Sequence, residues 1–258
     1  MAGMSQAYGR EGLCLVRRPC RSPGLLSGPV TTTTAPLHSR PFFALQGGRP
    51  EGCAYPQTFH ELGVLHVPSG RLEASDPYVS LGAGCTVPVP PGSYPVFVTV
   101  ADVSEAADGS HPRESYLSVV LHDDAPVAAV RLGVPEGERA PGEGVWYGVG
   151  VDAGTVAFAD AQAAEALSRR ADDVLEETHD RWMELQDDPR HHGSNRANVP
   201  LPGAAGGENL ALAHSGWGDG FYPLVTTHDA DGRLLGVHID LLVASATHWK
   251  DERGDGER

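Results

Sequence analysis

The sequence predicts an α+β fold: a single antiparallel, β-rich domain that carries one long amphipathic helix. Glycine and proline together account for 53 of the 258 residues, well above average usage. Short β-branched runs alternate with turn residues along most of the chain, as in a protein built from many short strands. Only one segment, from residue 160 to about residue 186, has the three- and four-residue apolar spacing of a helix.

The strands are predicted from apolar runs that end at turn residues. The run Tyr94–Ala101 follows a Pro-Pro-Gly-Ser turn and is apolar on both faces, as in an inner strand. The other predicted strands are Leu62–Val67, Arg71–Ala74, Tyr116–Leu121, Pro126–Leu132, Val145–Val151, Thr155–Phe158, Asn209–Ala213, Phe221–Thr227 and Arg233–Leu242. Tight turns are expected at 68–70, 122–124, 152–154 and 229–232, and those at 122–124 and 229–232 are expected to close hairpins.

The predicted helix begins at Asp160, whose carboxylate suits an N-cap and the positive end of the helix dipole. Positions 160–188 hold ten acids and three arginines around an apolar stripe. Such a stripe is typical of a helix that lies on its own sheet, and a partner-binding helix is the alternative. Residues 189–207, which contain His191 and His192, are expected to form a variable, flexible loop. Solvated histidines are favoured there over a metal site.

Charge divides the chain into a basic start and an acidic remainder. Residues 1–50 hold six arginines and one acid, a net charge of +5, whereas residues 51–258 hold 13 basic and 33 acidic groups, a net charge of −20. The first segment has no sustained apolar period, so we expect 1–50 to be a disordered basic extension. A single globular domain is expected at 51–246 and a charged tail at 247–258.

Composition excludes several classes of protein. A net charge of −15 argues against a general nucleic-acid-binding surface, because phosphate repels an acidic protein. No apolar run approaches the roughly 20 residues that span a bilayer, and the run at 12–16 is too short for a secretory signal. Four cysteines without a Cys-x-x-Cys pair favour free thiols in a reducing compartment. We therefore expect a soluble, cytoplasmic protein, and 18 arginines against one lysine suggest a bacterial source.

The most unusual segment is Ser-Gly-Trp-Gly-Asp-Gly-Phe-Tyr-Pro at 215–223. If it is extended, alternation places Ser215, Trp217, Asp219 and Phe221 on one face, as in the wall of a binding cleft. The candidate binding residues are Ser215, Trp217, Asp219 and Tyr222. The alternative is a glycine-rich turn in which Asp219 binds its own backbone and Trp217 fills the core.

Two further turns carry a carboxylate: Asp76 precedes a proline and Asp152 lies between glycines. If the fold brings Asp76, Asp152 and Asp219 together, their repulsion requires a cation or raised pKa values. These three are the candidate catalytic residues, and Asp152 and Asp219 are the candidate ligands of a hard metal ion. The alternative is three separate turns in which each carboxylate binds local amides. The sequence identifies no cofactor.

Taken in order, these segments resemble the bacterial family known as domain of unknown function 4241. The resemblance spans roughly residues 60–243 and is carried by Gly70-Arg71-Leu72, Ser75-Asp76-Pro77, Val89–Val96, Gly150–Gly154 and the 215–223 motif. The family name implies no activity, so the resemblance assigns no role to these residues.

Two functions from different classes remain open. The first is a non-enzymatic binding or interaction protein, of an accessory or immunity type, that takes a basic protein partner or a small molecule. An acidic surface favours encounter with a cationic partner, and no catalytic constellation is complete. The second is a metal-dependent or hydrolase-like enzyme that uses Asp76, Asp152 and Asp219, with Trp217 as a substrate platform. The sequence favours the first, with neither a nucleic acid nor a membrane as partner.

Overall fold

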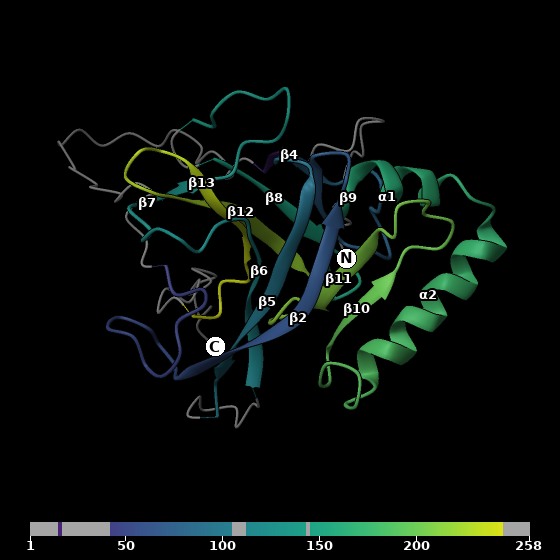
Figure 1. Ribbon diagram of the computed structural model, residues 1–258. Helices are drawn as coiled ribbons and strands as arrows, with labels where there is room; N and C mark the ends of the chain where they lie inside the picture. Colours follow the sequence, from purple (N-terminus) through teal and green to yellow (C-terminus); the bar gives the residue numbers. More distant parts are fainter. Residues whose placement is uncertain (1–14, 17–41, 105–111, 143–144, 245–258) are drawn as a thin grey trace, which may run out of the picture.

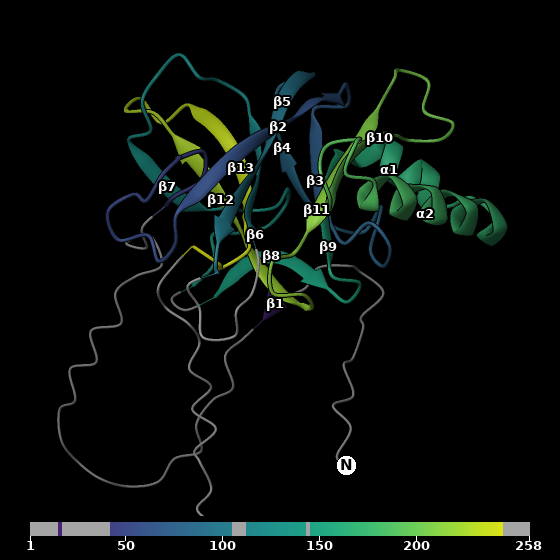
Figure 2. The same ribbon diagram turned by 90° about the horizontal axis from the view of Figure 1, so that it is seen from below.

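The computed structural model describes residues 15–16, 42–104, 112–142 and 145–244. They form two antiparallel sheets packed face to face, with two helices beside the smaller sheet (Figures 1 and 2). The predicted α+β class and the β-rich character of the domain are confirmed. Within these ranges no helix has the length and apolar character needed to cross a membrane.

The larger sheet has the strand order β1-β8-β12-β13-β6-β5-β2, and β7 pairs with β12. Its strands are β1 (Leu15–Val16), β2 (Gln57–Val67), β5 (Gly92–Asp102), β6 (Pro112–Val120), β7 (Ala129–Leu132), β8 (Trp146–Val151), β12 (Gly220–His228) and β13 (Leu234–Asp240). The smaller sheet has the order β10-β11-β9-β3-β4. Its strands are β3 (Arg71–Ser75), β4 (Cys85–Pro88), β9 (Thr155–Asp160), β10 (Arg196–Pro200) and β11 (Asn209–His214).

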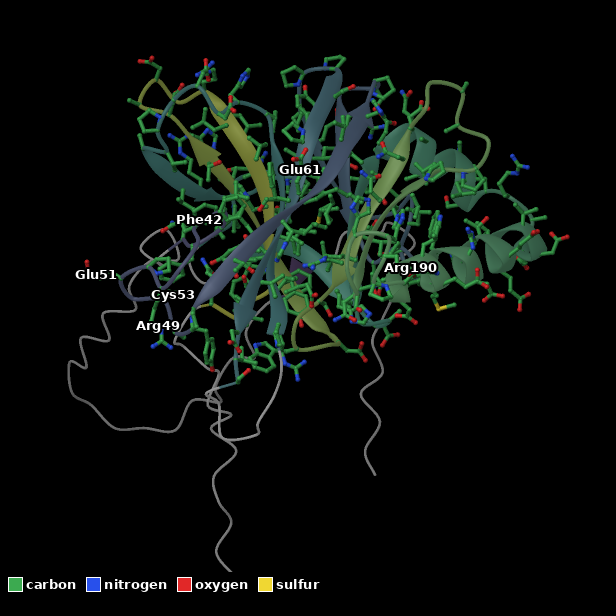
Figure 3. The ribbon with its side chains drawn as sticks, turned by 60° about the horizontal axis from the view of Figure 1, so that its bottom comes forward. Phe42, Arg49, Glu51, Cys53, Glu61 and Arg190 are labelled. Atoms are coloured by element: carbon green, nitrogen blue, oxygen red, sulfur yellow. The ribbon has the colours of Figure 1, made fainter. Side chains whose placement is uncertain are left out.

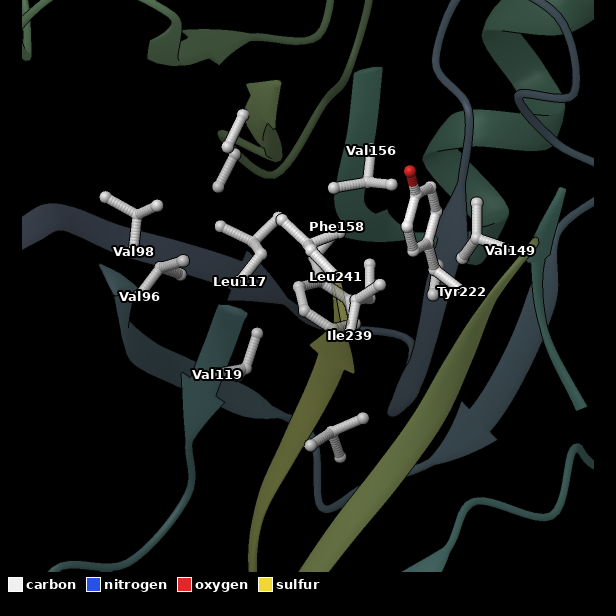
Figure 4. Close-up of a cluster of buried hydrophobic side chains, with 14 of the residues drawn as sticks. Val96, Val98, Leu117, Val119, Val149, Val156, Phe158, Tyr222, Ile239 and Leu241 are labelled. Atoms are coloured by element: carbon white, nitrogen blue, oxygen red, sulfur yellow. The ribbon is translucent and has the colours of Figure 1, made fainter. Parts of the chain in front are cut away.

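The main core lies between the two sheets. Strand alternation sends Val96 and Val98 of β5 and Ile239 of β13 inward to meet Phe158 of β9 (Figure 4). On the same strand as Phe158, Ala159 faces the opposite way, into a second apolar cluster beneath the helices. Strand β9 is therefore buried on both faces, which explains its continuous apolar sequence.

The predicted single helix is two helices in the structure. α1 (Ala161–Ser168) packs on β3 and β9, whereas α2 (Asp172–Asp187) packs on β10. Asp160 caps α1 as predicted and accepts hydrogen bonds from two N–H groups of its first turn. The break at 169–171 contains neither proline nor glycine, so the apolar period gave no sign of it. Because the strands of a sheet are twisted, two short helices follow its surface better than one straight helix.

The turn residues predicted correctly where the chain reverses direction, but they did not predict all the strand pairings. The predicted hairpin at 122–124 is wrong: β6 pairs with β5 and β13, and β7 lies across the sheet on β12. The hairpin at 229–232 is confirmed, because β12 pairs with β13. The turns at 68–70 and 152–154 are present, but each carries the chain from one sheet to the other. Strands β4 and β10 were not predicted, and β10 lies within the segment expected to be a loop.

A strap at residues 42–55 covers the outer face of the larger sheet. Phe42 packs edge-on against Tyr116 and His238, and Phe43 and Tyr116 belong to a third apolar cluster. Figure 3 shows Phe42 and Cys53 on this strap beside the sheet. Phe43 and Ala44 of this strap are buried, whereas residues 46–49 are exposed.

Two asparagine side chains close the gap between β2 and the smaller sheet. Asn198 of β10 donates to the carbonyls of Leu62 and Val64, at 2.7 and 3.1 Å. Asn209 of β11 donates to the Val64 carbonyl at 2.7 Å and accepts from the His66 N–H at 2.9 Å. From Leu62 to His66 the outer edge of β2 is therefore hydrogen-bonded by side chains rather than by a neighbouring strand.

Candidate functional site

The three candidate carboxylate segments meet at one end of the sandwich, around the turn at 152–154. Asp76 Oδ2 accepts from the N–H groups of Asp152 and Ala153, at 3.0 and 2.9 Å. Asp219 Oδ1 accepts from the N–H of Gly154 at 3.1 Å. Asp76 and Asp219 thus bind three consecutive amides of the same turn, which joins β8 to β9.

Asp76 is completely buried, and backbone donors surround its carboxylate. Besides the two bonds to the 152–154 turn, Oδ1 accepts from the Tyr78 N–H at 3.0 Å. The Ser80 hydroxyl accepts from the Asp76 N–H at 3.2 Å, so the whole residue is fixed in the β3–β4 connection. Burial of a charge is tolerated when hydrogen bonds replace its water, and here they tie two loops together.

The loop at 215–219 is held by its own polar groups. Ser215 Oγ and the Tyr222 hydroxyl both donate to the Gly218 carbonyl, at 2.6 and 2.7 Å. Gly216 and Gly218 have φ values of +69° and +92°, which other residues rarely adopt. The segment is therefore not extended, and the alternation expected to align Ser215 with Asp219 does not apply.

Trp217 is the large apolar side chain that this loop leaves at the surface, with 37% of its area exposed. The guanidinium carbon of Arg113 lies 4.8 Å from the centre of its ring, and Arg113 Nη1 donates to the Gly216 carbonyl at 2.8 Å. Guanidinium groups stack favourably on indole faces. Arg113 belongs to none of the sequence motifs, so its contact with Trp217 could not be predicted from the sequence.

Asp152 and Asp219 are both exposed, and Asp152 contributes its main chain rather than its carboxylate to the contact with Asp76. Throughout the ranges that the structure describes, no three His, Cys, Asp or Glu side chains are arranged to hold a metal ion. His191 and His192 lie with ring centres 4.5 Å apart, and His191 Nε2 is 3.1 Å from the Asn198 carbonyl oxygen.

A second set of polar side chains connects this end of the sandwich to α2. The Tyr78 hydroxyl donates to Gln186 Oε1 at 2.9 Å, and Gln186 Nε2 donates to the Thr155 hydroxyl at 3.4 Å. Burial raises the pKa of Tyr78, as do the nearby carboxylates of Asp187 and Asp76. The Tyr78 phenol is therefore neutral at physiological pH and acts as a donor. This set fixes the C-terminal end of α2 beside the 152–154 turn.

A buried serine–histidine pair lies elsewhere, beneath the strap. Ser118 Oγ is 2.9 Å from His238 Nδ1, and Thr227 Oγ1 is 3.1 Å from His238 Nε2. The spacing is that of a nucleophile and its base. However, burial lowers the pKa of His238 to about 3, and a general base works best with a pKa near the operating pH. Ser118 and His238 are buried in the sheet, so the arrangement favours a structural network.

The outward face of α2 is strongly acidic. Thr178, Trp182 and Gln186 are buried toward the sheet. The helix carries seven acids and one arginine, a net charge of −6. Figure 3 shows side-chain oxygens along the outward side of this helix. An open hollow on this face is lined by Asp173, Glu176, Glu177, Asp180, Arg181 and Glu184.

Comparison with protein families matches residues 65–239 to a family described as "Protein of unknown function (DUF4241)". No curated protein and no solved structure matches the chain. The matched range covers more than half of the sequence and includes Asp76, the 152–154 turn and the 215–223 motif. The chain therefore belongs to the DUF4241 family.

Proposed function

We propose that this protein is a non-enzymatic binding protein, of an accessory or immunity type, that recognises a basic protein partner through Trp217 and the acidic face of α2. The observation that carries the proposal is that the polar side chains around the motif loop are hydrogen-bonded within the protein, whereas its tryptophan is exposed. Ser215 and Tyr222 bind the loop carbonyl of Gly218, and Asp76 binds main-chain amides, while the Trp217 indole stays exposed. A rigidly held, exposed tryptophan is the kind of side chain that anchors protein interfaces.

The charge of α2 supports the nature of the partner. The helix ends beside the motif loop: the Asn195 N–H donates to the Gln186 carbonyl, and the His214 N–H donates to the Asn195 carbonyl. A partner anchored on Trp217 would thus meet the C-terminal end of an acidic helix. Complementary charge chiefly accelerates association and excludes acidic competitors. Under this proposal the exposed carboxylates increase the association rate of the partner, and the indole lowers its dissociation rate.

We place this activity in a bacterial cytoplasm. The arginine-rich, lysine-poor composition supports a bacterial source. Within the described ranges, the Cys53 and Cys85 thiols are buried and donate to main-chain carbonyls, which is compatible with a reducing compartment. The alternative enzyme function has less support, because the Asp76 carboxylate is occupied by three backbone donors and not directed at a cleft.

The test uses the full chain as bait in crosslinking capture from bacterial lysate, followed by binding kinetics with the purified captured protein. Three baits are compared with the wild type: Trp217→Ala, the helix reversal E176K/E177K/D180K, and the matched reversal E51K/E61K/D123K at exposed acids away from α2. We expect Trp217→Ala to raise the dissociation rate and the helix reversal to slow association at low salt. The matched reversal should do neither. Equal kinetics for all four proteins would refute the proposal.

A further inference from the structure

Arg196 lies at the start of β10, next to the edge strand β2 (Figure 1). The asparagine contacts show that these two strands run in the same direction. Asn198 binds residues 62–64 of β2, whereas Asn209, which pairs with residue 200, binds residues 64–66. Because Arg196 precedes Asn198 by two residues, it lies level with residues 60–61 of β2.

Arg196 and His60 both point toward the space between the two sheets. Side chains alternate along a strand, so Arg196 shares the face of Asn198, whereas Ala197 faces the apolar cluster beneath the helices. His60 pairs with Val98, whose side chain lies in the main core, and directly paired residues share one face of a sheet. His60 is nevertheless exposed, because β2 is the last strand of its sheet. The two side chains therefore border the same open margin of the sandwich.

On its other side, Arg196 is held by the connection from α2. Its Nε donates to the His192 carbonyl at 2.6 Å. A Cβ atom on Gly193 would lie 2.5 Å from Arg196 Nη2, so the guanidinium lies directly on the Gly193 main chain. His191, whose Nε2 is hydrogen-bonded to the Asn198 carbonyl, lies with its ring centre 4.5 Å from that of His192. Arg196 and His192 thus have fixed positions, and both are partly exposed.

The charge of Arg196 is only partly balanced. Arg190, on the same connection, forms an ion pair with Asp188, whereas Arg196 forms none with any carboxylate of the described ranges. The acid whose charge acts on Arg196 is Glu114 of β6, which is 4% exposed and whose pKa burial raises to about 7. Glu114 is therefore about half protonated near neutral pH. A partly buried charge is normally paired, and this domain otherwise carries an excess of acids.

We propose that Arg196, His60 and His192 form a binding site for a small oxyanion of the phosphate-monoester class. A guanidinium presents planar N–H donors that match the oxygens of a phosphate group. The two imidazoles add donors, and each can take up a proton when a dianion binds beside it. Three such groups supply more positive charge than one carboxylate neutralises, so a phosphate dianion fits them better. The site uses none of the residues through which the basic partner is proposed to bind, so it does not rest on the proposed function.

The two histidines already respond to Arg196. The pKa of His60 is lowered by burial and then by the Arg196 charge. The pKa of His192 is lowered by burial, by His191 and by Arg196. A bound dianion would oppose the effect of Arg196 and favour the protonated imidazoles. Binding should therefore raise the pKa values of both histidines, a response that a purely structural arginine would not produce.

The test follows the histidine Cε1 resonances of the full chain by NMR while inorganic phosphate replaces chloride at constant ionic strength. His60→Gln and His192→Gln assign the two signals. In the wild type we expect both signals to shift saturably and both pKa values to rise. Arg196→Gln should weaken phosphate binding by about tenfold or more, because it removes the charged donor. Arg190→Gln, the matched arginine of the same connection, should leave the affinity unchanged.

The absence of a saturable shift in the wild type would overturn the inference. Equal weakening in Arg196→Gln and Arg190→Gln would also overturn it, because general charge screening would then explain the shifts. The signal of His238, which is buried beneath the strap, reports whether Arg196→Gln is folded. If that variant is not folded, His60→Gln at its exposed position decides: it should weaken binding by about fivefold, and an unchanged affinity would refute the site.

The class of ligand is tested with methyl phosphate and acetate under the same conditions. Methyl phosphate should produce the same shifts of the His60 and His192 signals as inorganic phosphate. Acetate should bind more weakly, because its single charge balances fewer of the donors. Acetate that binds as tightly as methyl phosphate would overturn the assignment to phosphate monoesters.

Discussion

Replacing Glu73 with glutamine should remove a pH dependence of stability that the fold imposes. Glu73 is 2% exposed on β3 and accepts a hydrogen bond from the Gly82 N–H at 2.8 Å, beneath the β3–β4 connection. Burial raises its pKa from 4.5 to about 7. Each tenfold change in the ionisation equilibrium corresponds to about 1.4 kcal/mol, so ionising Glu73 in the folded state costs about 3 kcal/mol.

The sign follows from the direction of the pKa change. A pKa raised by folding gives stability that is complete below pH 4.5 and is lost as the pH rises through about 7. Glutamine cannot ionise, so the free energy of unfolding of the wild type should fall relative to Glu73→Gln by about 2.5 kcal/mol between pH 5 and pH 8.5, because a small part of the loss occurs below pH 5.

Urea unfolding of both proteins across this range measures the difference directly, and all other titrating groups cancel. Glu176→Gln, at an exposed position on α2, is the control and should show a difference that does not vary with pH. The reasoning would be refuted if the difference between the wild type and Glu73→Gln were also independent of pH.

Three further predictions concern the site. Asp76→Asn should destabilise the protein by about 2 kcal/mol in urea unfolding, because an amide cannot accept all three backbone hydrogen bonds; an unchanged midpoint would show that these bonds are not needed. Gly216→Ala should lower the free energy of unfolding by about 3 kcal/mol or more, because the added Cβ would collide with the Glu114 carbonyl. Gly218 also has a positive φ but has open space around it, so Gly218→Ala should lower it by about 1 kcal/mol. Equal losses of stability in the two variants would contradict the packing argument. Trp217→Ala should change the free energy of unfolding by no more than about 1 kcal/mol, because the indole is partly exposed. The same variant should weaken partner binding by about 2 kcal/mol or more. A large loss of stability in urea unfolding would instead make the indole a core residue.

The fold class was predictable because strand-forming runs and turn residues are local signals. The pairing of the strands was not predictable. Pro68-Ser69-Gly70 and Asp152-Ala153-Gly154 have the composition of hairpin turns, but each connects a strand of the larger sheet to a strand of the smaller one. Whether a turn closes a hairpin or crosses between sheets depends on contacts distant in sequence. The break between α1 and α2 escaped prediction for the same reason, because the shape of the sheet beneath decides it.

The candidate site was located by its motifs, but its chemistry was not predictable from them. Asp76 and Asp219 both contact the 152–154 turn, yet each binds main-chain amides there. A carboxylate between turn residues has the same sequence signature whether it binds an amide, a metal ion or a substrate. Arg113 and Glu114 were missed because a charged residue at the start of an ordinary strand carries no local pattern.

The asparagine contacts along β2 bear on how the molecule avoids self-association. An open strand edge presents unpaired N–H and C=O groups on which a second chain can add a strand, and folded proteins usually block such edges with charge, proline or a bulge. Here Asn198 and Asn209 bind the Leu62 and Val64 carbonyls and the His66 N–H, so those groups are unavailable to an incoming strand. Gln57 at the start of β2 pairs with Gly48 through the main chain, so the two amide side chains protect the stretch from Leu62 to His66. Apolar residues of similar size in place of the two asparagines would leave the polar groups of this stretch open to an incoming strand.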